Sequence, residues 1–350
     1  MPLDKRFTYK LLNWYTQNKR VLPWKRDKDV YKIWISEIIL QQTRVEQGTP
    51  YYEKFILAFP TVHALADATI EQVLKRWEGL GYYSRARNLH SSAIYIVNEL
   101  NGRFPDDLKG LLELKGIGPY SAAAIASFAY DLPHPVVDGN VVRFLARLLG
   151  IYSDKNAAQT HNELRKVLKP LIEYAEPSDF NQALMNFGSM VCSPKLTKCK
   201  ICVFQLDCYA FANGKVNELP TKKPTKKKRN RFFTFLVWDR NGKVAIEQRG
   251  DEEIWKKLYQ FPLFESTKKS FESFELITND KVCVDPKEHS FIETKHVLSH
   301  QNLFIRFIKI SPKNQPINNN NWIWVKEDNL VDYPFPIVLK NYIKQELLSQ

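Results

Sequence analysis

The chain has 350 residues and a formal charge of +13, from 51 lysines and arginines against 38 aspartates and glutamates. This length allows one to three domains, and 44% apolar residues are enough to build real cores. No segment approaches twenty uninterrupted apolar residues, and the N-terminus lacks the apolar core of a signal peptide. We therefore expect a cytoplasmic protein with no membrane span, and the positive charge favours a polyanionic partner such as nucleic acid.

Two parts of the chain follow different patterns. Residues 1–212 show helical periodicity and little strand patterning. Residues 213–230 are basic, contain two prolines and lack apolar periodicity, which predicts an exposed basic linker. From Phe232 onward, aromatic and β-branched runs of strand length predict an α+β domain over residues 231–350. The sequence therefore predicts a helical domain and an α+β domain joined by a charged segment.

The first unusual element is an almost wholly apolar run, residues 33–43, which contains one carboxylate, Glu37. Glu37, Gln41 and Arg44 lie at i, i+4 and i+7, so one interpretation is a thin solvated stripe on a helix. The alternative is that the flanking apolar side chains desolvate Glu37 and raise its pKa, which keeps a proton available near neutrality. A general acid needs such a proton.

A second motif is LKGIGPYSAAAIASFAY, residues 114–130. Gly116 and Gly118 allow a tight turn before a small-residue helix, and they leave peptide N–H groups free where a phosphate can bind. This pattern is typical of a helix–hairpin–helix that grips a DNA backbone without reading bases. The alternative is a purely structural corner between two helices.

The run PHPVVDGNVVRFLARLLG follows, with Asp138 just before a predicted helix. A plain N-cap aspartate explains that position. A carboxylate at a helix start also stays ionised, so the same side chain could face a developing cation. We expect both roles to coexist at Asp138.

Four cysteines lie in VCSPKLTKCKICVFQLDC with the spacing C-x6-C-x2-C-x5-C: Cys192, Cys199, Cys202 and Cys208. Two disulfides belong to small secreted chains, which this chain does not resemble. Zinc sites usually use two CxxC pairs, and only one such pair is present. Four cysteines with unequal gaps fit a 4Fe–4S cluster better.

These motifs, in this order and together with GLGYYSRARNL at residues 79–89, resemble the helix–hairpin–helix base-excision DNA glycosylases that carry a 4Fe–4S cluster. Within them the chain is most similar to the adenine DNA glycosylases of the MutY type, closely over residues 7–212 and loosely over 231–350. The resemblance implies a helical helix–hairpin–helix glycosylase domain that includes the cluster loop, followed by an α+β MutT/Nudix-like domain.

The resemblance also implies roles for individual residues. Glu37 would protonate adenine, Asp138 would stabilise the sugar cation, and Tyr120 and Asn140 would orient Asp138 and the sugar. The base must leave the duplex stack to reach them. The residues expected to bind the flipped base or the duplex are Trp24, Gln42, Tyr82, Gly116, Gly118 and Gln182. For Tyr82 the alternative is core packing.

In the C-terminal domain, the resemblance implies recognition of 8-oxoguanine through a Phe-Ser-His loop. Here that loop reads Leu298, Ser299 and His300, so the polar groups remain and the aromatic wedge is lost. A surface β-turn is the alternative for these residues. The clustered glutamates of a catalytic Nudix box are missing from the sequence, so we expect the fold without pyrophosphatase activity.

Together these expectations describe a monofunctional, monomeric adenine DNA glycosylase of base excision repair that acts on duplex DNA with adenine opposite 8-oxoguanine or guanine. The alternative is a bifunctional lyase of the endonuclease III type, which removes oxidised pyrimidines. Those enzymes carry a Schiff-base lysine in the hairpin, and this chain has Tyr120 at that position. A non-catalytic DNA-binding or redox module is a further alternative, against which Glu37 and Asp138 argue.

Overall fold

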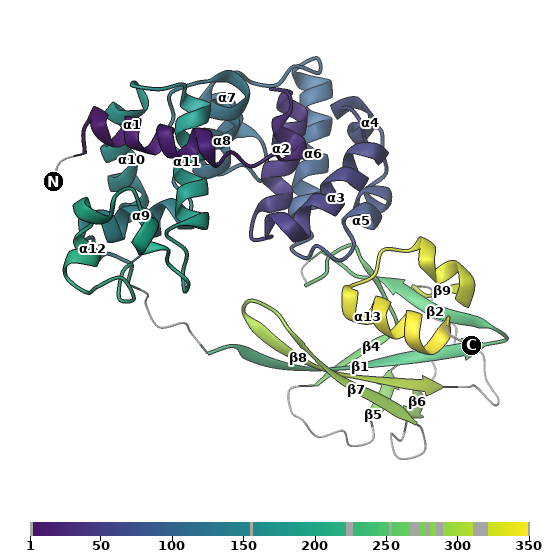
Figure 1. Ribbon diagram of the computed structural model, residues 1–350. Helices are drawn as coiled ribbons and strands as arrows, with labels where there is room; N and C mark the ends of the chain where they lie inside the picture. The colour runs from purple at the N-terminus through teal and green to yellow at the C-terminus, as the bar shows by residue number, and fades with distance from the viewer. Residues whose placement is uncertain are drawn as a thin grey trace. The chain divides into compact units, whose positions relative to one another are not determined.

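The computed structural model describes residues 3–154, 157–221, 227–251, 254–266, 274–277, 281–284, 290–310 and 321–348 (Figure 1). The chain forms two compact units. The first unit contains Met1–Asp67 and Asn88–Pro224, and the second contains Ala68–Arg87 and Thr225–Gln350. The chain thus enters the second unit at residue 68, returns at residue 88, and enters it again at residue 225.

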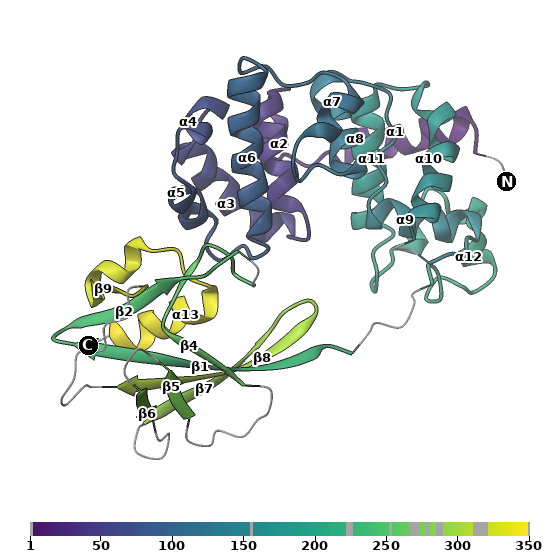
Figure 2. The ribbon, with the colours of Figure 1, turned by 180° about the vertical axis from the view of Figure 1, so that it is seen from behind.

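The first unit is helical, as predicted for this part of the chain (Figure 2). Its helices are α1 (Lys5–Gln17), α2 (Val30–Leu40), α3 (Val45–Ala58), α4 (Val62–Ala66), α6 (Ser84–Glu99, which starts in the second unit), α7 (Leu108–Glu113), α8 (Pro119–Tyr130), α9 (Gly139–Leu149), α10 (Ala158–Ile172), α11 (Pro177–Met190) and α12 (Tyr209–Ala212). Short 3-10 turns lie at Pro23–Lys25, Cys199–Ile201 and Gln205–Asp207. None of the helices in the described residues is long and apolar enough to cross a membrane.

Local sequence explains where the site-bearing helices begin. The Asp29 carboxylate accepts hydrogen bonds from the backbone N–H groups of Tyr31 and Lys32 and caps α2. Pro119 stands at the first position of α8, where its missing N–H is not needed. Asp138 caps α9 through the N–H groups of Asn140 and Val141.

The core of the first unit joins helices that are far apart in sequence. Phe7 and Leu11 of α1, Phe144 of α9, Phe187 of α11 and Phe204 are all buried in one cluster. The phenylalanine rings are tilted against one another, with centroids 4.6 Å apart for Phe144 and Phe187 and 5.0 Å apart for Phe7 and Phe204. This packing fixes α9 and α11, which carry several of the predicted site residues.

The second unit is built on a mixed sheet of β1 (Arg229–Arg240), β2 (Lys243–Gln248), β3 (Tyr259–Gln260), β4 (Leu263–Ser266), β7 (Phe291–Val297), β8 (Gln301–Ile310) and β9 (Ile323–Lys326). The strand order is β3-β2-β1-β8-β7, with β4 paired to β1 and β9 paired to β2. Strands β1 and β8 are parallel, and Phe235 is in register with Phe307. A separate hairpin is formed by β5 (Phe274–Ile277) and β6 (Lys281–Val284).

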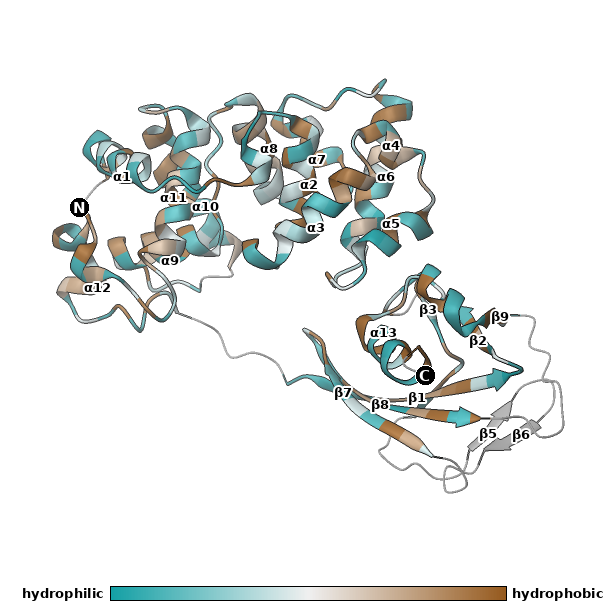
Figure 3. Cartoon of the chain, turned by 45° about the vertical axis from the view of Figure 1, so that its right-hand side comes forward, coloured by the Kyte–Doolittle hydropathy of each residue, from teal (hydrophilic) through white to brown (hydrophobic). Residues whose placement is uncertain are grey.

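Helix α13 (Ile337–Tyr342) covers one face of this sheet and is followed by a π-helical turn, Ile343–Leu347. The hydrophobic stretches of β1 and β8 lie beside it in Figure 3. Phe233 and Phe235 of β1, Phe307 of β8 and Tyr342 of α13 belong to one buried cluster, and the rings of Phe307 and Tyr342 stack with centroids 4.0 Å apart. The expected α+β fold is therefore present.

Two segments differ from the sequence expectations. Helix α5 (Ile70–Trp77) and the turn after it group with the second unit, although they lie within the helical half of the sequence. The predicted linker is not exposed throughout, because Leu219 is buried and its carbonyl accepts a hydrogen bond from Arg147 Nε at 2.9 Å. Lys222, Lys223 and Lys226 lie outside the described residues, and β1 already begins at Arg229.

Candidate active site

Glu37 is buried in α2, with 7% of its surface exposed. It is not part of a solvated stripe, which leaves the desolvated carboxyl as the interpretation that fits. Burial raises the pKa of Glu37 to about 7, the Lys25 ammonium and the Tyr120 hydroxyl act to lower it, and the Asp138 carboxylate acts to raise it. A carboxyl with this pKa holds a proton on a large fraction of molecules at neutral pH.

Tyr120 joins Glu37 to the helix–hairpin–helix. It lies in the first turn of α8, and its hydroxyl is close enough to the Glu37 carboxyl to lower the pKa of that group. Burial is the largest cause that raises the pKa of Tyr120 well above its usual value, followed by the charges of Glu37 and Asp138. Tyr120 is therefore a neutral phenol that faces both carboxyl groups.

Asp138 is held by a dense set of donors. Its Oδ1 accepts from the N–H groups of Asn140 at 2.9 Å and Val141 at 2.8 Å, and its Oδ2 accepts from Asn140 Nδ2 at 2.6 Å. Burial raises the pKa of Asp138, while these hydrogen bonds and the Arg143 guanidinium act to lower it. The two carboxyl groups therefore differ in surroundings, since Asp138 accepts three hydrogen bonds, whereas the groups that favour the charged form of Glu37 are the Lys25 ammonium and the Tyr120 hydroxyl.

Arg143 links this site to the cysteine loop. Its Nη2 donates to Asn140 Oδ1 at 3.0 Å and to the Gly188 carbonyl at 2.6 Å, and its Nε donates to the Cys192 carbonyl at 2.7 Å. Helices α9 and α11 can approach this closely because residue 188 is glycine, and a Cβ there would lie 2.5 Å from the Asn140 carbonyl oxygen. Arg143 thus fixes the orientation of the Asn140 amide.

A cavity of about 260 Å³ opens beside Glu37. The predicted base-binding residues Trp24 and Gln182 both line it, together with Lys25 and Ser178. Gln182 Oε1 accepts from the Tyr15 hydroxyl at 3.0 Å, and Gln182 Nε2 donates to Ser178 Oγ at 2.9 Å. One amide hydrogen and one oxygen lone pair of Gln182 remain for a ligand.

The hairpin glycines have different roles. Gly116 has φ +83°, and a Cβ there would lie 2.8 Å from the side chain of Asn88, so both conformation and space require glycine. Gly118 has extended backbone and open space around it, which corrects the expectation that both glycines make the tight turn. Because no side chain caps the N-terminus of α8, the approach to its backbone at Gly118 is open.

Gln42 follows the end of α2, is exposed and has φ +59°. Its neighbour Gln41 is the side chain that contacts the hairpin, because Gln41 Nε2 donates to Ser121 Oγ at 3.1 Å. The structure thus leaves Gln42 exposed, and Gln41 connects the end of α2 to the hairpin.

In the second unit, Tyr82 and Ser299 lie together. Tyr82 is 45% exposed, which excludes core packing, and its hydroxyl is hydrogen-bonded to the Ser299 hydroxyl. Ser299 and His300 are exposed at the tip of the hairpin between β7 and β8, closed by a 2.8 Å bond from Leu298 N–H to the Gln301 carbonyl. Residues 298–301 therefore form the surface turn that was the alternative interpretation of this loop. Leu298 packs inward against the sheet core.

The four cysteines line one small cavity of about 30 Å³, enclosed by Phe144, Arg147 and Phe204. All four thiols are free, so the disulfide alternative is not supported. Among the described residues, no three His, Cys, Asp or Glu side chains are placed to hold a single metal ion. Four thiols around one apolar cavity are a donor set that fits a multi-iron cluster, for which soft ligands are required.

The cysteine loop is also fastened by groups other than the thiols. Phe204 is buried in the core of the first unit. Arg147 Nη1 donates to the Ser193 carbonyl at 2.9 Å and contacts Cys192 Sγ at 3.5 Å.

Sequence reasoning missed Lys25, Arg143 and Arg147. The two arginines could have been noticed from their i, i+4 spacing in the largely apolar helix α9, because charged side chains on such a helix need partners when they are buried or half-buried. Lys25 gave no such signal, because its relation to Glu37 depends on how the turn at Pro23–Lys25 packs against α2.

Comparison with family models agrees with this architecture. Residues 35–170 match the HhH-GPD superfamily of base excision DNA repair proteins, and residues 233–345 match the NUDIX domain. A thermostable thymine-DNA glycosylase of solved structure is 28% identical, with a TM-score of 0.55 over 60% of this chain and 96% of its own. Endonuclease III in complex with DNA has a TM-score of 0.53 at 20% identity over 61% of this chain and 98% of its own, which shows a shared fold. Fold and site together define a DNA base-excision glycosylase with a C-terminal NUDIX domain.

Comparison with individual proteins shows which DNA glycosylases the chain resembles in sequence. The chain is 32% identical over 345 residues to the adenine DNA glycosylase of Buchnera aphidicola from Acyrthosiphon pisum, covering 97% of this chain and 98% of that protein. It is 41% identical over 213 residues to the adenine DNA glycosylase of Homo sapiens, covering 58% of this chain and 39% of the human protein. The chain belongs to the adenine DNA glycosylases, DNA N-glycosylases of base excision repair.

Proposed function

We propose that this protein hydrolyses the N-glycosyl bond of adenine paired with 8-oxoguanine or guanine in duplex DNA, as a monomer and without cutting the strand. The observation that carries the proposal is the buried Glu37 carboxyl, with its pKa raised to about 7, beside a cavity lined by Trp24 and Gln182. That combination suits a general acid acting on a planar, hydrogen-bonding base.

Glu37 supplies the proton in this mechanism. Adenine leaves poorly as an anion, so protonation at N7 by Glu37 makes it a neutral leaving group as the glycosidic bond breaks. Burial keeps the acid protonated before the reaction, and the Tyr120 hydroxyl and the Lys25 ammonium favour the carboxylate left after transfer. Trp24 lines the base pocket, and the free hydrogen-bonding positions of Gln182 suit the edge of adenine.

Asp138 faces the sugar in the same scheme. Loss of the base leaves an oxocarbenium ion, which an ionised carboxylate stabilises or traps briefly before water attacks. The three hydrogen bonds from Asn140 and Val141 support the ionised form against the burial that opposes it. Tyr120 has no amine, so the Schiff-base route of a lyase lacks its nucleophile there.

Duplex binding would use the hairpin and the exposed side chains. The open backbone at Gly118, which follows the tight turn at Gly116, suits a phosphate, which positions DNA without reading it. Gln42 and Tyr82 are exposed and suited to fill the gap left by the flipped base. Ser299 and His300 supply polar groups for 8-oxoguanine.

We further propose that Cys192, Cys199, Cys202 and Cys208 hold a 4Fe–4S cluster. The family and the shared cavity of the four thiols support it. The cluster would cross-link the loop to the segment that follows α11, which Arg143 and Arg147 of α9 hold through the carbonyls of Cys192 and Ser193, and so secure the frame of the active site.

The test is single-turnover excision on duplexes with adenine opposite 8-oxoguanine, opposite guanine and opposite thymine. Strand breaks should appear only after alkali, and only for the first two duplexes. Borohydride should trap no protein–DNA complex with wild type. Absence of alkali-dependent breaks would contradict the proposal, and a trapped complex would contradict the monofunctional assignment. Repeating the trap with Lys25→Met would then tell whether this cavity amine, whose pKa burial lowers to about 8, is responsible.

A further inference from the structure

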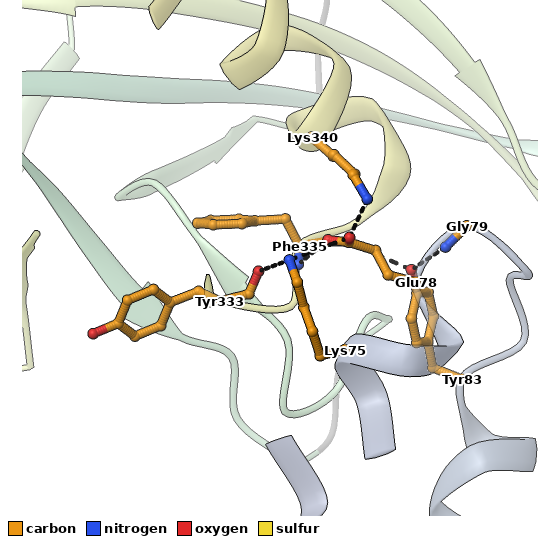
Figure 4. Close-up of polar contacts among 7 residues, drawn as sticks. All are labelled: Lys75, Glu78, Gly79, Tyr83, Tyr333, Phe335 and Lys340. Atoms are coloured by element: carbon orange, nitrogen blue, oxygen red, sulfur yellow. Dashed lines mark hydrogen bonds and ion pairs between the residues drawn. The ribbon is translucent and has the colours of Figure 1, made fainter. Parts of the chain in front are cut away.

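A buried carboxylate in the second unit, Glu78, has no part in the proposed mechanism. It follows the last residue of α5, and its side chain is 3% exposed. Glu78 Oε1 accepts from the Phe335 N–H at 3.1 Å, and its Oε2 pairs with Lys75 Nζ at 3.3 Å and with Lys340 Nζ (Figure 4). Three donors thus converge on one acid.

The donors belong to segments that are distant in sequence. Lys75 is on α5, whereas Phe335 and Lys340 are about 260 positions later, in the loop before α13 and in α13 itself. A buried carboxylate is tolerated only when its charge is compensated, so Glu78 requires both segments to be in place at once. Lys75 Nζ also donates to the Tyr333 carbonyl at 3.0 Å, which adds a second link between the same segments.

The turn that follows Glu78 is fixed at its other end too. Tyr83 accepts from the Gly79 N–H at 3.3 Å and donates to the Phe335 carbonyl at 3.4 Å. Between these two attachments, residues 79–82 form a turn with positive φ at Gly79, Gly81 and Tyr82, of +97°, +74° and +48°. A non-glycine residue such as Tyr82 rarely adopts this conformation, so the surroundings must hold it.

We propose that Glu78 is a positioning residue that fixes the 79–82 turn to the α13 segment, and thereby sets where Tyr82 stands relative to the Ser299 hairpin tip. Tyr82 and Ser299 are already hydrogen-bonded through their hydroxyl groups. The consequence is that these two side chains meet DNA as one rigid surface, and that Glu78 contributes to the preference for adenine opposite 8-oxoguanine. This consequence rests on the proposed function.

The experiment compares Glu78→Gln with Glu71→Gln in the full chain. Both replace an acid of the α5 segment with an amide of the same shape, and both acids face the C-terminal residues, since Glu71 contacts Gln248 at 3.5 Å on the surface. Glu78→Gln should lower the ratio of excision rates opposite 8-oxoguanine and opposite guanine by roughly tenfold, or about 1.4 kcal/mol, and Glu71→Gln should leave it unchanged. A general loss of stability would lower both rates and not their ratio.

Hydrogen exchange gives a readout that does not depend on catalysis. Amides of residues 77–83 and 333–340 should exchange faster in Glu78→Gln than in Glu71→Gln. If the wild type excises no adenine at all, the proposed function fails, and the exchange data alone decide the positioning role. Equal exchange in the two variants would overturn that role.

Lys340→Met covers the case in which Glu78→Gln does not fold. Lys340 is 45% exposed, so its replacement should not prevent folding, and it removes one of the two ion pairs. Lys340→Met should lower the same ratio in the same direction by a smaller factor. An unchanged ratio in every folded variant of this pair would overturn the proposal.

Discussion

The cavity beside Glu37 in the first unit and the hairpin tip of the second present polar groups in opposite ways. Glu37 is buried, and its pKa is raised to about 7 by loss of water. Ser299 and His300 are exposed on a two-residue turn. Proton transfer at neutral pH needs a carboxyl whose pKa the protein has raised, which burial and neighbouring groups achieve. Recognition of a base edge needs donors and acceptors that DNA can reach.

Substitutions in the two regions should therefore have different effects on excision. Changes at the buried site should reduce the chemical step for every substrate. Changes at the exposed tip should alter the choice between substrates and leave the chemical step in place. Excision rates measured on more than one duplex separate these outcomes.

The largest effect is expected for Glu37→Gln. The amide keeps the shape of the acid but cannot donate its proton, so single-turnover excision should fall by about 100- to 10,000-fold. Binding to duplex with adenine opposite 8-oxoguanine, measured at fixed salt, should change little. Glu37→Gln that retains a substantial rate would mean that Glu37 is not the acid.

Cys199→Ala tests the cluster. The purified wild type should be yellow-brown and contain iron and sulfide, and the variant should lose iron and give less folded protein. Because Phe204 and Arg147 also fasten this loop, part of the population should still fold. Zinc without iron or sulfide in wild type prepared anaerobically would refute the cluster.

At the hairpin tip, Ser299→Ala combined with His300→Ala should lower the preference for 8-oxoguanine over guanine by roughly tenfold, since both hydrogen-bonding side chains are removed. Excision opposite guanine should hardly change, because the acid and its cavity are intact. If the variant prefers 8-oxoguanine over guanine as strongly as the wild type does, other residues recognise 8-oxoguanine. Point substitution is preferable to deletion of residues 231–350, because the deletion would also remove the hydrogen-bond partners of Lys75 and Glu78.

The pH profile provides a finer test of the buried site. Glu37 works in its protonated form, so the rate should fall as pH rises through its pKa of about 7. The Lys25 ammonium acts to lower that pKa, and Lys25→Met should therefore move the falling limb to higher pH. Lys19→Met is the control, because Lys19 lines the same cavity but pairs with Asp179 at 3.1 Å. If the excision rate of Lys25→Met falls at the same pH as that of the wild type, Lys25 does not affect the pKa of Glu37.

The smallest effect on excision is expected for the basic linker, residues 213–230, and the arginine that follows it. Its cations are Lys222, Lys223, Lys226, Lys227, Lys228, Arg229 and Arg231. Replacing Lys222, Lys223, Lys226 and Lys227 with serine should weaken binding to any duplex alike. It should also flatten the dependence of binding on salt, by about 0.9 in slope for each phosphate that the protein no longer neutralises. A change in base preference would contradict a purely electrostatic role.

Several features could be predicted from sequence because they are local. The N-cap at Asp138, the turn at Gly116 and the spacing of the four cysteines depend on residues within a few positions of each other. Glu37 stood out because one acid interrupts an apolar helix. The α+β character of the C-terminal part followed from its strand-length runs, which the sheet confirms.

The tertiary structure alone decided the contacts between distant segments. Periodicity gives the buried face of a helix but not the partner of that face, so the hydrogen bonds from Arg143 to both Asn140 and Cys192 could not be foreseen. The same holds for Lys25, whose charge acts to lower the pKa of the Glu37 carboxyl. Packing also placed Glu78 against Phe335, because a carboxylate that leaves water must find its donors wherever the fold brings them.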